Sequence, residues 1–147
     1  MHGTRQEGSP YTAFRTMLEQ VIGQPFSAAG FRLQENAMHH MRGLFRYEKA
    51  LADPLWISVA FQMLPYADGL GRFQVALRRS TADAVLQEIS LARLVWEGFQ
   101  VGQLGSPEHW WQFRTPHELA YALVEAGKLI FAFGVPYLEG SLAPDSH

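Results

Sequence analysis

The side chains best suited to acid–base or metal chemistry are the histidines, which include the adjacent pair His39 and His40 and the separate His109 and His117. Neighbouring residues of an extended chain point to opposite sides, so the pair cannot readily chelate one metal ion. The HExxH and HxH spacings are missing, and the chain has no cysteine to act as a thiolate ligand or nucleophile. The sequence therefore predicts no metal site and no cofactor, while a long-range convergence of His39, His109 and Glu118 stays open.

Other patterns typical of enzymes are also missing. The glycines at 69–72 (GLGR) stand between two expected strands, and neither GxGxxG nor GxxxxGK[ST] occurs. No GxSxG segment is present, and the carboxylates are scattered along the chain. These patterns favour a non-enzymatic protein. The alternative is a small-molecule-binding or hydrolytic domain with a pocket between helix and sheet, whose polar groups come from His39, Arg46 and His109.

Arginine supplies ten of the twelve basic side chains, and many of them share one face of the expected strands. If the strands of residues 42–79 are read out of phase with their apolar positions, that second face carries Arg42, Arg46, Glu48, Trp56, Gln62, Arg72, Gln74 and Arg78. Arginine forks beside a tryptophan suit a carboxylate or phosphate group of a partner. The commoner alternative is a solvated face with Arg–Glu pairs across the strands.

The pair Trp110-Trp111 precedes the last expected helix, and its side chains should point to opposite faces of an extended segment. We expect one tryptophan to cover the core and the other to lie nearer solvent, where it could anchor a partner; a purely structural pair is the alternative. The candidate binding residues are Arg42, Arg46, Trp56, Arg72, Arg78, Trp110 and Trp111.

These candidates depend on an antiparallel sheet in the middle of the chain. Apolar and polar residues alternate in 55–64, and weaker alternation flanks it in 42–51 and 72–79. The joins are short and rich in turn residues, which favours hairpins over parallel crossovers. Residues 82–97 fit either a helix or a strand, and we favour a turn or helix over 81–87 followed by a strand.

Helices are expected on both sides of these strands. Ser9-Pro10 has the pattern of a helix start, and apolar residues then recur at helical spacing until Gly30. Thr115 and Pro116 open a second helix, for which Gly134 is the expected end because Pro136 follows it. The expected fold is α+β, with an antiparallel meander of three to five strands and the C-terminal helix on one sheet face.

Composition bounds the remaining possibilities. A chain of 147 residues is typical of one domain, which we place at 9–139 between loose ends at 1–8 and 140–147. The net charge of −2 gives no overall attraction to nucleic acid or to an anionic membrane. The N-terminus has no apolar signal region, and the lack of cysteine fits a reducing compartment, so we expect a cytoplasmic protein.

The order of parts resembles small bacterial α+β domains that are catalogued as families of unknown function. The resemblance covers roughly 10–140 and is carried by Gly30-Phe31, Trp110-Trp111 and the segment 134–138 (GVPYL). It implies a bacterial source but brings no activity or site residues. The leading expectation is a protein-interaction module, either a regulator or an immunity-type protein; a homodimer and nucleic-acid binding through the arginine face are the alternatives.

Overall fold

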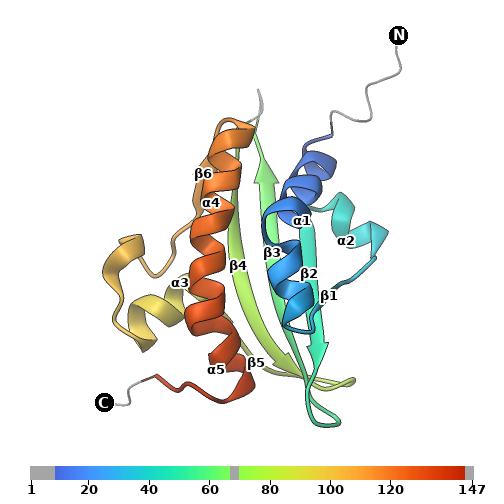
Figure 1. Ribbon diagram of the computed structural model, residues 1–147, viewed down its shortest axis with the longest axis vertical. Coiled ribbons are helices and arrows are strands. Elements are labelled where there is room, and N and C mark those ends of the chain that lie inside the picture. The colour runs from blue at the N-terminus through green and yellow to red at the C-terminus, as the bar shows by residue number, and fades with distance from the viewer. Residues whose placement is uncertain (1–8, 67–69, 145–147) are drawn as a thin grey trace.

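The computed structural model describes residues 9–66 and 70–144. Two long helices pack on one side of an antiparallel sheet (Figure 1). The helical elements are α1 (Pro10–Ala28), α2 (Ala37–Met41), α3 (Leu91–Arg93), α4 (Pro116–Leu129) and α5 (Val135–Glu139), with π-turns at Leu94–Gly98 and Ile130–Gly134 and a 3-10 turn at Gly102–Leu104. The strands are β1 (Arg32–Leu33), β2 (Leu44–Ala50), β3 (Trp56–Pro65), β4 (Gly71–Ser80), β5 (Val85–Ser90) and β6 (Trp111–Phe113).

The strands pair in the order β1-β2-β3-β4-β5, all antiparallel, and β6 pairs with the beginning of β4. Along β2, β3 and β4 each strand follows its neighbour through a short connection, as a meander requires. The predicted fold class is therefore confirmed: an N-terminal helix, an antiparallel sheet, and a C-terminal helix on one sheet face.

Alternation along the three long strands produces the core. Their inward positions are buried, and Phe45 opposes Phe61, which in turn opposes Val75. The inward set is Phe45, Tyr47, Ile57, Val59, Phe61, Met63, Phe73, Val75 and Leu77. The phenolic group of Tyr47 is buried with them, and desolvation, together with the negative charge of Glu19, raises its pKa to about 12.

Helix α1 begins where the sequence predicts. The Ser9 hydroxyl accepts a hydrogen bond from Thr12 N, and Pro10 occupies the first turn. One stripe of the helix, formed by Phe14, Leu18, Ile22 and Phe26, is fully packed on the sheet. The helix continues past Pro25 to Ala28, and Gly30 then adopts a φ of +93° that releases the chain into β1.

The prediction of a turn followed by a strand in residues 82–97 is right in its order, but the strand begins earlier than expected and a helix that was not predicted follows it. The chain turns at 81–84, where the Thr81 hydroxyl accepts from the amides of Asp83 and Ala84, and β5 then pairs with β4. The segment after β5 is helical, because Leu91, Ala92, Leu94 and Val95 bury themselves at helical spacing. The strand was hard to recognise because its residues 85–88 are exposed on both faces.

The start of the last helix is confirmed and its expected end is wrong. Thr115 caps α4, since its hydroxyl accepts from Glu118 N at 3.0 Å. Gly134 does not end the helix; it is buried in a π-turn, where an added Cβ would lie 3.3 Å from Leu77. Helical structure continues as α5 with Pro136 in its first turn, a position that needs no N–H, and ends at Gly140 with φ +84°.

The helical run Pro116–Glu139 is long and apolar enough to cross a bilayer by length and composition, and half of its most apolar stretch is buried within the protein. A core helix passes the same test of composition.

Of the ends that we expect to be loose, residues 1–8 and 145–147 lie outside the described part of the chain. Residues 140–144 are described, and the amides of Ser141 and Leu142 both donate to Pro136 O.

Candidate binding face

The second face of the sheet, which we call the open face, lies opposite α1 and α4 (Figure 1). The strand pairing aligns its residues in rows. One row runs from Glu48 through Ser58 to Arg78 and Glu88, and the next runs from Arg46 through Ala60 to Ala76 and Ser90. The small residues Ser58 and Ala60 on the central strand are buried, so longer side chains of the open face cover them.

Two arginines on the open face, Arg46 and Arg78, are close enough for their charges to repel. The Nε atoms of both are buried without a hydrogen-bond partner. Burial first, and then the charge of Arg78, lower the pKa of Arg46, and the charges of Glu48 and Glu88 offset only part of this effect. Within residues 9–66 and 70–144 Arg46 has no ion-pair partner, while Arg78 reaches Glu88 at 3.4 Å. An anion bound beside Arg46 would therefore offset part of the free-energy cost of burying this charged side chain.

His39 adds a third titratable group to this surface. It lies in the helical turn α2 and is half-buried. Desolvation is the largest cause that lowers the pKa of His39, followed by the charges of Arg46, Arg42, His40 and Arg78. Its neutral form is therefore favoured near pH 7, and protonation at lower pH would add positive charge beside Arg46.

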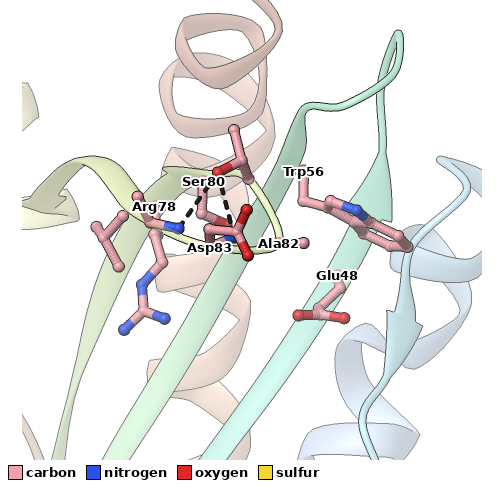
Figure 2. A pocket seen from close by; sticks show the side chains of 9 residues that line it. Glu48, Trp56, Arg78, Ser80, Ala82 and Asp83 are labelled. Carbon is pink, nitrogen blue, oxygen red and sulfur yellow. Dashed lines mark hydrogen bonds between the residues drawn. The ribbon is translucent and has the colours of Figure 1, made fainter.

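Trp56 stands between two hollows at the end of the open face where β5 begins. One hollow, of about 390 Å³, is lined by Glu48, Trp56, Arg78 and the 80–85 turn. The other, of about 620 Å³, lies between β1 and β2 and is also lined by Glu48 and Trp56. Figure 2 shows Glu48, Trp56 and Arg78 projecting from the same side of the sheet, with a helix behind it. The exposed Trp56 side chain therefore lies next to the charged residues Glu48 and Arg78.

Arg72 and Trp110 form a separate cluster at the opposite end of the open face. The Arg72 guanidinium lies over the Trp110 ring at 4.3 Å and near the Tyr66 ring at 5.8 Å. Trp110 is half-buried. The next residue, Trp111, points to the other side, where it is 3% exposed and donates from Nε1 to Glu125 Oε1 at 3.0 Å. Trp111 is thus a core residue and Trp110 faces the open side, the two positions that we expected of the pair.

Arg42 does not lie on a strand. It follows α2 as its C-terminal cap, is exposed, and accepts a hydrogen bond from Gln62 Nε2 through its carbonyl oxygen. The structure therefore places the predicted binding residues with Trp56 and Arg78 toward one end, Arg46 in the middle, Arg72 and Trp110 at the other end, Arg42 at the margin and Trp111 inside.

The histidines fall into two groups: His39 and His40 lie in α2, while His109 and His117 line one hollow with Glu118. Of the convergence left open for His39, His109 and Glu118, only His109 and Glu118 share a hollow. His40 contacts Arg15 Nη1 at 3.3 Å and Gln34 O at 3.0 Å and stacks on Phe45, so it joins α2 to the core. His109 lines a hollow on the α4 side together with Trp111, and desolvation lowers its pKa. In the described part of the chain, no group of three His, Cys, Asp or Glu side chains could hold a metal ion.

Sequence reasoning missed two features that the fold creates. The exposed apolar side chains Val85 and Leu86 belong to the beginning of β5, which the sequence assigned to the preceding turn, and they flank the Trp56 end of the open face. An apolar cavity also opens between the beginnings of α1 and α4. Its residues come from four distant segments, so no local pattern marks it.

Comparison of the chain with protein-family models, with curated proteins and with solved structures finds no significant match. The function must therefore be argued from the geometry.

Proposed function

We propose that this protein is a non-enzymatic bacterial binding module whose open face binds an acidic segment of another protein. The observation that carries the proposal is Arg46, a half-buried cation beside the like charge of Arg78, with no carboxylate at ion-pair distance in the described residues and only the more distant charges of Glu48 and Glu88 to attract it. A carboxylate from a partner would accept from both guanidinium groups, and such charge-assisted bonds are the stronger kind.

The residue types at the Trp56 end also suit a protein partner. Tryptophan and arginine are the side chains most often found to dominate binding energy at protein interfaces. Trp56 is 41% exposed, and Val85 and Leu86 add apolar surface beside it. The partner segment should therefore combine carboxylates with at least one apolar side chain.

A protein partner fits better than nucleic acid. Glu48 and Glu88 lie in the same row as Arg78 and repel any anion, so they disfavour a continuous phosphate backbone more than a peptide with a few carboxylates. The overall charge of −2 gives no long-range attraction to a polyanion. The lack of cysteine suits a reducing compartment, and we place the protein in the cytoplasm.

The test is a capture experiment with the tagged protein in an extract of the source cells. The wild type should retain a stoichiometric partner, and the double variant Arg46→Ala/Arg78→Ala should lose it. Arg93→Ala is the matched control, because Arg93 pairs with Glu97 and Glu108 away from this face. If no partner is retained, or if the double variant retains it equally, the proposal fails.

A second measurement separates the alternative ligands. Fluorescence anisotropy with a labelled peptide of alternating glutamate and leucine should show binding that weakens at least tenfold in Arg46→Ala. A labelled single-stranded oligonucleotide should bind weakly even at low salt. Tight oligonucleotide binding that falls steeply as salt rises would favour nucleic acid instead.

A further inference from the structure

The apolar cavity between the two helices is more enclosed than the hollows beside Trp56, and it shares no lining residue with them. Its volume is about 430 Å³, within the range of small-molecule sites. It lies at the end of the sheet where α1 and α4 both begin (Figure 1). The lining residues are Pro10, Ala13, Phe14, Met17, Met63, Tyr66, Leu70, Phe113, Arg114, Thr115, Pro116 and Leu119.

The inner part of the cavity is built from rigid core residues. Phe14, Met63, Phe113 and Leu119 are all buried, with exposures of 0%, 2%, 7% and 5%. The Phe113 ring packs directly over Gly71, where an added Cβ would lie 2.7 Å from Phe113 Cζ. The absence of a side chain at position 71 thus lets the ring lie close to the backbone of β4, and the ring forms part of the cavity wall.

The outer part of the cavity keeps apolar side chains accessible to solvent. Tyr66 is 49% exposed and Leu70 is 37% exposed at its rim, while Met17 is half-buried. Exposure of apolar surface to water is unfavourable, and the rim and the hollow expose such surface together. An apolar molecule that entered the cavity would cover both the wall and the rim.

The electrostatics of the mouth favour an anionic group on that molecule. Arg114 is the one charged residue among the lining residues, and it has no ion pair within the described residues. The positive ends of the α1 and α4 dipoles meet at the same mouth. Glu118, which accepts from Arg114 N through Oε1, offsets part of this charge but does not line the cavity.

We propose that this cavity binds an amphiphilic small molecule with an apolar chain and a single carboxylate, of the medium-chain fatty acid class. The chain lies between α1 and the Phe113 wall, and the carboxylate lies at the mouth, where it accepts hydrogen bonds from the Arg114 guanidinium.

The test uses dodecanoate as the probe and isothermal titration calorimetry on the full chain. Dodecanoate should bind, and dodecanol and dodecyltrimethylammonium should each bind at least tenfold more weakly. Arg114→Gln should weaken dodecanoate about tenfold, because a hydrogen-bonded charged contact is lost. Arg93→Gln is the matched control and should bind like the wild type.

A second pair of variants locates the ligand. Ala13→Phe places a ring in the cavity mouth from an exposed helix position, and it should abolish dodecanoate binding without loss of the melting transition. Thr16→Phe adds the same ring to an exposed position of α1 outside the cavity and should bind normally. Unchanged binding in Ala13→Phe, equal binding of dodecanol, or no binding of dodecanoate would each overturn the proposal. Arg46→Ala should leave dodecanoate binding intact, so the two proposals can fail separately.

Discussion

The two faces of the sheet are formed by the same strands but differ in packing and charge. On the helix side, large rings interlock: Phe26 lies on Tyr47 with ring centroids 4.1 Å apart, and Phe61 meets Phe26 edge-on at 6.2 Å. On the open face, short side chains separate arginines that repel one another. The comparison indicates that the helix side supplies most of the stability, while the open face keeps charged side chains whose burial is only partly compensated.

Loss of a ring from the helix side should have the largest effect. Phe61 is fully buried on the central strand, so Phe61→Ala should cost about 3–5 kcal/mol of unfolding free energy. Its neighbour Gln62 faces the open side, and Gln62→Ala should cost less than about 1 kcal/mol. Urea titration of both variants measures the contrast. Equal losses would show that the two faces do not divide stability in this way.

Removal of a charge from the open face should separate stability from binding. Arg46→Met should weaken the acidic partner peptide at least tenfold and leave the urea midpoint unchanged or higher, since the charged form of Arg46 is disfavoured by burial. The same replacement at Arg93, which pairs with Glu97 at 2.5 Å, should not affect peptide binding. A large loss of stability in Arg46→Met would mean that this arginine serves the fold.

The stability of α4, which covers part of the helix side, depends on its N-cap residue Thr115. Thr115→Ala should cost about 1 kcal/mol, because Glu118 N loses the hydroxyl oxygen to which it donates at 3.0 Å. Thr115→Ser keeps the oxygen and should retain most of the stability. An unchanged urea midpoint in Thr115→Ala would contradict the role of this cap.

The smallest effect should come from pH. Because the pKa of His39 in the folded protein lies below its ordinary value of 6.5, the unfolded chain takes up a proton first as the pH falls. The stability that neutral His39 contributes is therefore present above pH 6.5 and decreases as the pH falls toward its folded pKa. His39→Gln should flatten this dependence between pH 7.5 and 5.5 in urea titrations, and His117→Gln is the control.

The same protonation should act on binding with the opposite sign. A positive His39 beside Arg46, Arg42, His40 and Arg78 strengthens the attraction for a carboxylate, so the affinity for the acidic peptide should rise as the pH falls. His39→Gln should remove the rise. A peptide affinity that falls with pH in the wild type would contradict this arrangement.

Local patterns predicted the parts of the fold that depend on local physics. The period of two in 55–64 located β3 and the orientation of its side chains, and Thr115-Pro116 located a helix start, because alternation and capping involve neighbours along the chain. Arg46, Trp56 and Arg78 were placed on one face for the same reason.

The errors occurred where distant contacts decide the structure. Gly134 followed by Pro136 has the pattern of a helix end, but the packing of Gly134 on Leu77 keeps the chain helical. Strand β5 has too little burial to show a period, and only its pairing with β4 defines it. The cavity beside Phe113 joins four segments, which no sequence spacing could indicate.

The segment around the π-turn at Ile130–Gly134 is held by contacts on both sides, which limits insertions and deletions within it. Before it, Gly127 of α4 lies against Ile22 of α1; after it, the carbonyl oxygens of Tyr137 and Leu138 accept from Arg79 Nη2 at 3.0 and 2.7 Å. One residue added or removed between these contacts would rotate the end of the helix by about 100° and separate those carbonyls from Arg79. Natural variants of this segment should therefore keep its number of residues constant, with side-chain exchange confined to its exposed positions.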